Sequence, residues 1–256
     1  MKNGNKEITG LSISPKSKAL RLGKQPVNAY GQKLFSITQE VNLAYGSKIV
    51  LTGQNGVGKT VFLEQVKDGK LEGFYNPQIK IGYFNQNIVT SQTNKTLLNS
   101  LFATSIFDDS STMQVLGDLH LRQYGERKIS ELSGGQLVCF NLAKIITGQY
   151  NLLLLDEPTN FLDIASINAL AEFVRDYPFA MILVSHDQAF IKQLKVERWQ
   201  IKDGRLITSQ SQKKRAQEGS DNELELLKFK LDQLMLDSKA SISEIKQVKA
   251  QIQELQ

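Results

Sequence analysis

Short stretches of alternating apolar and polar side chains make up the N-terminal part of the chain. Residues 8–14 and residues 33–43 both alternate in this way, which is typical of strands with one buried face. Glycine and proline residues, and a Tyr-Gly-Ser cluster at 45–47, separate such stretches. The pattern predicts several short strands between Glu7 and Val50, arranged as an antiparallel layer.

Continuous apolar runs replace this alternation further along the chain. Residues 49–52, 152–155 and 180–184 are almost entirely apolar or β-branched, as expected for strands buried on both faces of a parallel sheet. Helical patterns lie between these runs, and polar side chains follow the runs directly. Strands that alternate with helices indicate an α/β fold with a mainly parallel sheet, whose site lies along the edge where the strands end. Residues 80–87 predict a further short strand with Gln86 in its polar tip.

A region of helical periodicity lies in the middle of the chain. Residues 92–131 carry apolar side chains at a spacing of three to four, interrupted by a polar cluster at 108–111. Together with the apolar helix that follows residue 136, this pattern predicts a small helical subdomain over about residues 92–146. His120 lies in this region between two leucines, where a lone histidine is usually structural, and we assign it no role.

The end of the chain differs in composition from the rest. Residues 208–219 are polar and basic without periodicity, which predicts a linker after a domain formed by residues 1–207. Residues 220–256 hold two Ser-x-x-Glu capping boxes, each followed by apolar residues at helical spacing. One continuous coiled coil would place serines in its seam, so we expect two helices folded into a hairpin. Such an extension serves either as a packing appendage or as an arm that binds nucleic acid or a partner.

Composition is that of an ordinary globular protein. The 256 residues are 41% hydrophobic, which suffices for one large domain with an appendage. Cys139 is the single cysteine, which excludes an internal disulfide, and its apolar neighbours predict a buried structural thiol. The chain shows no apolar run of membrane-spanning length and no signal peptide, so we expect a cytoplasmic protein without membrane insertion. The net charge of +5 slightly favours an anionic partner such as RNA.

A glycine-rich loop follows the apolar run at residues 49–52. It fits the phosphate-binding motif G-x-x-x-x-G-K-[ST], and the order of strand, loop and helix is the context that this motif requires. Glycines let consecutive backbone N–H groups turn toward a polyphosphate, and the following helix directs its positive end to the same anion. Lys59 is expected to reach the β- and γ-phosphates, and the Thr60 hydroxyl to ligate Mg²⁺. The residues expected to contact the phosphates are Gly53, Gln54, Asn55, Gly56, Val57, Gly58, Lys59 and Thr60.

Three further motifs follow this loop. Residues 132–136 read LSGGQ, one buried apolar run ends in Asp156 and Glu157, and the next ends in Ser-His-Asp at 185–187. Over roughly residues 20–207, this arrangement resembles the ATP-binding-cassette (ABC) ATPases. The resemblance implies a P-loop NTPase core with an N-terminal antiparallel β layer and a small helical subdomain. It also implies ATP and Mg²⁺ as ligands and hydrolysis of ATP to ADP and phosphate.

The resemblance assigns a chemical role to individual residues. Asp156 would hold Mg²⁺ directly or through water, together with Thr60 and Gln86. Glu157 would be the general base that polarises the attacking water. His186 resembles the switch histidine that hydrogen-bonds the γ-phosphate, and Gln86 the loop glutamine that helps to place Mg²⁺ and water.

Other residues would contact the adenine or a second subunit. Tyr30 precedes Lys59 by 29 residues, which suits the aromatic residue that stacks on adenine in this family; a core or turn tyrosine is the alternative. In the family, LSGGQ contacts ATP held by another nucleotide-binding domain, and the loop aspartate that Asp163 resembles contacts the opposite subunit. One cassette thus contains two half-sites, so the implied partner is a second cassette, either in the same tandem protein or in a homodimer. The LSGGQ residues expected at this interface are Ser133, Gly134, Gly135 and Gln136.

Three features point to one branch of the family. Lys59 and Gln86 are 27 residues apart, and Gln86 and Ser133 are 47 apart, which leaves little room for a large helical subdomain that docks on membrane helices. PTNFLD at 158–163 resembles the TN-x-LD pattern of the ABC-F branch, whose members are soluble tandem-cassette proteins that act on ribosomes. Phe161 stands where that branch usually has histidine. The basic linker and helical tail also resemble ABC-F carboxyl-terminal extensions.

Three functions are therefore open. The first is a ribosome-associated ATPase, as the second cassette or a stand-alone half of an ABC-F protein of the translation-factor or antibiotic-resistance type, with ribosome or rRNA as partner. The second is the ATP-hydrolysing subunit of an ABC membrane transporter, which would need a separate membrane subunit. The third is a non-hydrolysing ATP-dependent clamp, against which the intact Glu157 and His186 speak.

Overall fold

The computed structural model describes residues 16–85 and 94–209, and the isolated positions 227, 247 and 251. The chain divides into two units, residues 1–207 and 208–256, and the description below concerns the first. The predicted strand at 8–14 and Gln86 lie outside the described residues, as does nearly all of the predicted hairpin at 220–256.

The centre of the unit is an eight-stranded, mainly parallel sheet. Its strand order is β2-β3-β11-β10-β5-β9-β8-β7. The five strands from β10 to β7 are parallel to one another. Every residue of β8 and β9 is buried, which explains why these strands are continuous apolar runs rather than alternating ones. The parallel strands are β5 (Lys48–Gly53), β7 (Ile81–Phe84), β8 (Leu152–Asp156), β9 (Ala180–Val184) and β10 (Glu197–Lys202).

The antiparallel strands that the alternating pattern predicts form a separate three-stranded sheet and one edge of the large sheet. β1 pairs with both β4 and β6 in a three-stranded antiparallel sheet, and β2 pairs with β3 in a hairpin at the edge of the large sheet. β11 continues from β10 and lies parallel to β3. These strands are β1 (Lys18–Leu22), β2 (Gln25–Ala29), β3 (Gln32–Ile37), β4 (Val41–Ala44), β6 (Gly73–Tyr75) and β11 (Arg205–Ile207).

The large sheet separates two hydrophobic clusters. Because side chains alternate along a strand, Leu152 and Leu154 pack with α1 (Lys59–Lys67), whereas Leu153 and Leu155 pack on the other side. The helices on that other side are α4 (Gly134–Thr147), α5 (Ile164–Asp176) and α6 (Gln188–Leu194). Cys139 of α4 is buried there, and burial raises the pKa of its thiol, which confirms the prediction of a buried structural cysteine.

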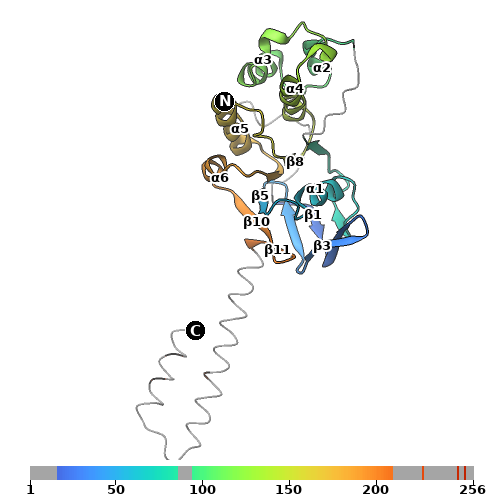
Figure 1. Cartoon of the computed structure of the whole chain (residues 1–256), viewed down its shortest axis with the longest axis vertical. Coiled ribbons are helices and arrows are strands. Elements are labelled where there is room, and N and C mark those ends of the chain that lie inside the picture. The colour runs from blue at the N-terminus through green and yellow to red at the C-terminus, as the bar shows by residue number, and fades with distance from the viewer. Residues whose placement is uncertain (1–15, 86–93, 210–226, 228–246, 248–250, 252–256) are drawn as a thin grey trace, which may run out of the picture. The chain divides into compact units, whose positions relative to one another are not determined.

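A group of short helices extends from this second side. In Figure 1, α2 (Leu97–Phe102), α3 (Asp109–Asp118) and α4 gather at one end of the unit, away from β1 and β3. The side chains of Thr96 and Asp108 cap α2 and α3 by accepting hydrogen bonds from backbone N–H groups in their first turns. Two short 3₁₀ turns, Arg122–Tyr124 and Ile129–Glu131, complete the link to α4. The helical periodicity of the sequence thus corresponds to several short helices rather than long ones.

Three neighbouring strands end at the same edge of the sheet. β5, β9 and β8 are adjacent in the strand order and parallel, so the segments that follow them emerge side by side. These segments begin with the glycine loop after β5, Glu157 after β8 and Ser185 after β9. Over the part of the chain that the structure describes, no helix is long and apolar enough to cross a membrane.

Candidate functional site

The glycine loop joins the end of β5 to the first turn of α1. Gly53, Gly56 and Gly58 all have positive φ, at 154°, 75° and 103°, which L side chains rarely adopt. At Gly53 a Cβ would also stand 2.9 Å from the backbone oxygen of Ile201, and at Gly58 one would stand 2.8 Å from Leu34. The sequence therefore needs glycine at these positions for the loop to wind tightly against β10 and β3.

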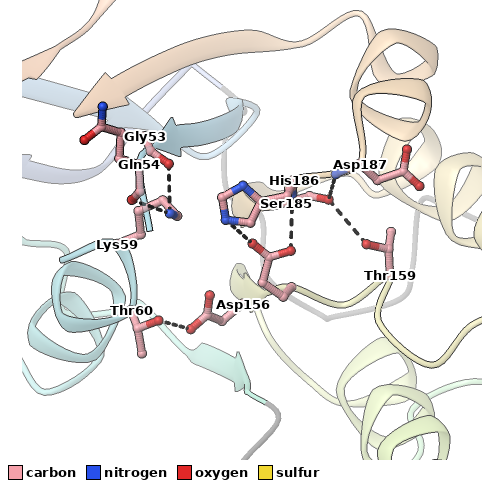
Figure 2. Close-up of polar contacts among 10 residues, drawn as sticks. Gly53, Gln54, Lys59, Thr60, Asp156, Thr159, Ser185, His186 and Asp187 are labelled. Atoms are coloured by element: carbon pink, nitrogen blue, oxygen red, sulfur yellow. Dashed lines mark hydrogen bonds and ion pairs between the residues drawn. The ribbon is translucent and has the colours of Figure 1, made fainter. Parts of the chain in front are cut away.

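Lys59 is held inside this loop. Its Nζ atom donates hydrogen bonds to the backbone oxygens of Gly53 and Gln54, at 3.0 Å each (Figure 2). The residue is only 7% exposed, and burial lowers the pKa of the ammonium while the charges of Glu157 and Asp156 oppose that shift. A buried cation among backbone dipoles at a helix N-terminus is suited to binding an anion.

Thr60 and Asp156 connect the first turn of α1 to the end of β8. The Thr60 hydroxyl donates a hydrogen bond of 2.6 Å to Oδ2 of Asp156 (Figure 2). Asp156 is buried, and burial raises the pKa of its carboxyl, against the effects of the Thr60 hydrogen bond and the Lys59 charge. The hydroxyl and carboxylate oxygens are thus brought together, as the sequence prediction of a shared Mg²⁺ site requires.

Glu157 and His186 face each other from the ends of β8 and β9. Nε2 of His186 lies 3.1 Å from Oε1 of Glu157, and the backbone N–H of His186 donates to Oε2 at 3.2 Å. The Glu157 side chain is 18% exposed, and burial raises the pKa of its carboxyl, an effect that the charge of His186 opposes. A carboxylate with a raised pKa, held by a histidine at the mouth of a phosphate loop, is suited to accept a proton from water.

Hydrogen bonds hold the segments after β8 and β9 together. The Ser185 hydroxyl lies 3.3 Å from the Thr159 hydroxyl and accepts a hydrogen bond from the Asp187 N–H at 3.1 Å (Figure 2). Asp187 in turn caps α6 by accepting from the N–H groups of Ala189 and Phe190. Since Thr159 and Ser185 are both buried, these contacts fix the backbone on either side of Glu157 and His186.

A cavity of about 420 Å³ joins these groups. It brings together residues from the loop, from β8 and from the segments after β8 and β9, and it adds Asn160, which the sequence analysis did not single out. A second cavity, of about 500 Å³, lies between α3 and α5 and is lined by none of the predicted site residues. The first cavity is lined by Asn55, Gly56, Lys59, Thr60, Asp156, Glu157, Asn160, Val184 and His186.

The LSGGQ residues lie at the N-terminus of α4 and do not line this cavity. Ser133 and Gln136 form a capping box, in which the Ser133 N–H donates to the Gln136 side chain at 2.9 Å. Gly134 and Gly135 have no positive φ, and no atom from elsewhere in the described chain comes within 4 Å of the Cβ that either would carry. Packing within the described residues therefore does not require glycine at these two positions.

Tyr30 is a turn residue. It lies between β2 and β3 with φ of 51°, followed by Gly31 at 76°, and its relative exposure of 101% excludes the core alternative. It does not line the cavity. Gln86, the remaining predicted ligand, lies outside the described residues.

Asp163 caps α5 and meets a residue that the sequence analysis left without a role. Its Oδ1 accepts a hydrogen bond from the Ser166 N–H at 2.8 Å, and its Oδ2 lies 2.9 Å from Nε2 of His120. The His120 side chain is 59% exposed and belongs to the segment after α3. No local sequence pattern predicts this contact, because the two residues meet only through the packing of α3 on α5.

Comparison with known proteins identifies the domain. Residues 38–160 match the family model described as ABC transporter. The chain is 35% identical over 160 residues to the erythromycin resistance ATP-binding protein MsrA of Staphylococcus epidermidis. This matched stretch covers 62% of this chain and 33% of that protein. The chain is also 31% identical over 196 residues to ABC transporter F family member 2 of Arabidopsis thaliana, which covers 72% of this chain and 28% of that protein.

The fold is also found in solved structures. The complex of archaeal ribosomal stalk protein aP1 with archaeal ribosome recycling factor aABCE1 matches with a TM-score of 0.63 at 20% identity, covering 78% of this chain and 42% of that chain. The matched stretches span a third or less of the length of the two curated relatives. The chain therefore contains an ATP-binding-cassette domain of the ABC transporter family, and its relatives include members of the F branch of that family.

Proposed function

We propose that this chain binds ATP with Mg²⁺ and hydrolyses it in partnership with a second cassette, as part of a ribosome-associated protein. The observation that carries the proposal is the cavity at the ends of three adjacent strands, where Lys59, Asp156 and Glu157 meet. A phosphate cradle, a pair of hard oxygen ligands and a carboxylate with a raised pKa are the parts that phosphoryl transfer to water requires.

The residues present suit a nucleotide–Mg²⁺ complex. The Thr60 hydroxyl and the Asp156 carboxylate supply two oxygen ligands, and no cluster of three or more His, Cys, Asp or Glu side chains among the described residues could hold a metal ion. Mg²⁺ is commonly bound in this way, through one or two protein oxygens, several waters and the phosphates of its nucleotide. When bound, it would neutralise charge that develops on the phosphate oxygens. Gln86 is proposed as a further ligand.

The base is proposed to be Glu157. Its carboxylate would accept the proton of the attacking water. His186 would orient this carboxylate through Nε2 and its backbone N–H. The same histidine is proposed to hydrogen-bond the γ-phosphate. Lys59 would contact the phosphates from inside the loop. Tyr30 would stack on the adenine, since its exposed ring at the β2–β3 turn is free of the core.

The second cassette is proposed from the open LSGGQ segment. Gly134 and Gly135 leave the N-terminus of α4 without side chains, although packing within the described chain does not require glycine at either position. A bare helix N-terminus admits the close approach of a phosphate from another molecule. Ser133, Gln136 and Asp163 would contribute to the same interface, with the partner supplied by a tandem protein or by a second copy.

The ribosomal role is proposed from charge and from the relatives. The chain carries a net charge of +5, and one similar structure is described as a ribosome recycling factor in complex with a ribosomal stalk protein. One curated relative is named for erythromycin resistance, and another belongs to the F branch. We therefore propose a cytoplasmic protein that acts on ribosomes, of the translation-factor or resistance type.

Glu157→Gln tests the proposed hydrolysis. The variant is expected to bind ATP with unchanged affinity and to lose about 100-fold or more of the hydrolysis rate, because the base is removed while the phosphate cradle is spared. It is also expected to accumulate as an ATP-bound dimer, measured by light scattering after size exclusion. Phosphate release is measured for the chain mixed with a second cassette and alone, with Glu126→Gln, an exposed carboxylate outside the cavity, as control.

Two results would contradict this proposal. One is a hydrolysis rate for Glu157→Gln equal to that of the unaltered chain, which would favour the non-hydrolysing clamp. The other is unchanged ATP affinity in Lys59→Ala, since that substitution removes the buried cation from the loop.

A further inference from the structure

Two contacts join the end of α3 to the beginning of α5. The Ser166 hydroxyl donates a hydrogen bond of 2.8 Å to the backbone oxygen of Asp118, and Nε2 of His120 lies 2.9 Å from Oδ2 of Asp163. Ser166 is 2% exposed, so the first contact is part of the packed core. The second lies at the surface, on the loop aspartate that we propose to face a second cassette.

The backbone at His120 makes the choice of histidine there informative. The Leu121 N–H donates to the Leu116 oxygen at 2.7 Å, and the His120 N–H donates to the Gly117 oxygen at 3.0 Å. This is the hydrogen-bond pattern of a helix end that places its capping residue in the left-handed region, usually as glycine. His120 occupies that position with φ of 54°.

A left-handed backbone conformation costs more free energy for histidine than for glycine. The His120 side chain is 59% exposed, so burial in the core does not compensate for that cost. What the side chain does is reach Asp163, whose pKa is held below its usual range by the hydrogen bonds from Ser166 and by the charge and hydrogen bond of His120. A strained residue kept at such a place is a reason to look for a functional role.

The surroundings of Asp163 fit a surface prepared for a partner. Phe161 is 68% exposed and Ile164 is 80% exposed, on either side of the aspartate. Phe161 also has a φ of 70°, which is rare for a bulky side chain. Two large exposed apolar side chains, one in the loop and one in the first turn of α5, are a feature of surfaces that bind a partner.

We propose that His120 is a positioning residue that ties α3, which packs against the LSGGQ helix α4, to the loop of Asp163. α3 packs against both α4 and α5, so the contact from His120 to Asp163 adds a further link between this pair of helices, α3 and α4, and the N-terminus of α5. Ser133 and Asp163, the N-caps of α4 and α5, would then be presented to a second cassette by helices that are held together through α3. The purpose of the His120–Asp163 contact rests on the proposed pairing of cassettes. The contact itself, called the brace below, is a property of the single chain.

Hydrogen–deuterium exchange of the full chain tests the brace without any partner. His120→Gly relieves the left-handed strain and removes the contact, whereas His120→Gln retains a donor at a similar distance from the backbone. In His120→Gly, exchange of the Ser166 and Ile167 amides is expected to become about fivefold faster, because a contact between two exposed side chains contributes little free energy. The Tm of this variant is not expected to fall. His120→Gln is expected to restore most of the protection.

A matched control is available at the end of α6. Lys195 also has a left-handed backbone, with φ of 49°, and Lys195→Gly relieves similar strain far along the chain from Asp163. It should leave exchange at Ser166 and Ile167 unchanged. Unaltered exchange in His120→Gly would overturn the proposal, and so would a fall in Tm with faster exchange throughout the chain, because either result would make His120 an ordinary structural residue.

The purpose of the brace is tested by ATP-dependent association. In the Glu157→Gln background, His120→Gly is expected to weaken dimer formation at least fivefold while the affinity of the monomer for ATP stays the same. Equal dimer affinity with and without His120 would overturn the proposed role. A Glu157→Gln chain that binds ATP and stays monomeric would instead overturn the proposed pairing, and the exchange measurement would still decide whether His120 braces the loop.

Discussion

Asp156 and Glu157 are neighbours in sequence but meet different groups at the end of β8. Asp156 accepts a hydrogen bond from the Thr60 hydroxyl, whereas Glu157 faces the imidazole and the backbone N–H of His186. Asp156 is the last residue of β8, whereas Glu157 follows the strand with a left-handed φ of 51°. The backbone therefore directs one carboxylate at the glycine loop and the other at the segment after β9. The pair thus separates the proposed metal ligand from the proposed base.

Burial of Glu157 predicts a pH dependence of stability. Its pKa is raised in the folded chain, so the folded state holds the proton more tightly than the unfolded state does. As pH rises from the unfolded pKa, about 4.3, through the raised folded pKa, the charged form becomes dominant and stability falls. Glu157→Gln removes this loss, so at pH 8 its Tm is expected to exceed that of the unaltered chain.

The comparison at low pH supplies the check. Near pH 4 the Tm values of the two chains should come closer together, because the carboxyl is then largely protonated in both states. Thermal unfolding in matched buffers at both pH values, with Glu126→Gln as an exposed control, measures the difference. A Tm gap that is the same at pH 4 and pH 8 would show that the ionisation of Glu157 is not its source.

At the scale of single elements, the glycines fall into two kinds. Gly53 and Gly58 are needed by the fold, because a Cβ would approach Ile201 or Leu34 to within 3 Å and both have positive φ. Gly134 and Gly135 meet no such obstacle within the described chain. The first kind shapes the loop between β5 and α1, and the second keeps the N-terminus of α4 open.

Gly135→Ala is expected to separate stability from function. Alanine is favoured over glycine in a helix by up to about 1 kcal/mol, so the Tm should stay the same or rise. ATP-dependent association and the hydrolysis that depends on it should fall, because the new methyl group stands where the phosphate of the partner's ATP would approach. Gly53→Ala is the contrasting variant, expected to lower the Tm. If Gly135→Ala hydrolyses ATP with a partner as fast as the unaltered chain, the proposed contact of α4 is wrong.

At the scale of the whole molecule, the phosphate loop and the LSGGQ segment of the described unit lie apart from each other. One chain carries a phosphate loop with its carboxylates and, separately, an LSGGQ segment that does not line its own cavity. The matched stretch covers 28% of one F-branch relative, which leaves room there for a second cassette. The proposed activity therefore needs a second cassette.

The proposed ribosomal partner predicts a salt-dependent association. The Glu157→Gln chain with ATP is expected to sediment with ribosomes through a sucrose cushion at low salt and to be released as salt increases, because contacts of basic residues with RNA phosphates weaken by counterion release. The same chain without nucleotide is the control. Equal amounts in the pellet with and without ATP at every salt concentration would indicate nonspecific attraction of a basic protein and would contradict the proposal.

The sequence by itself determined the order of strands and helices, the glycine loop and the family. These follow from local rules, since a buried strand, a glycine loop and a capped helix are each encoded in consecutive residues such as those from Ile49 to Leu63. The alternating pattern likewise predicted the antiparallel layer, and the apolar runs predicted β8 and β9. The domain assignment and the individual roles of the site residues stay predictions.

Only the tertiary structure decided which side chains meet. The Glu157–His186 contact depends on the pairing of β8 with β9. The exposure of Tyr30 depends on its place in the turn between β2 and β3. The His120–Asp163 contact depends on the packing of α3 against α5. These partners are far apart in the chain, and a lone histidine between leucines carries no local sign of its distant carboxylate. The physical reason is that sequence patterns report the surroundings of consecutive residues, whereas a contact between elements is set by how their faces pack.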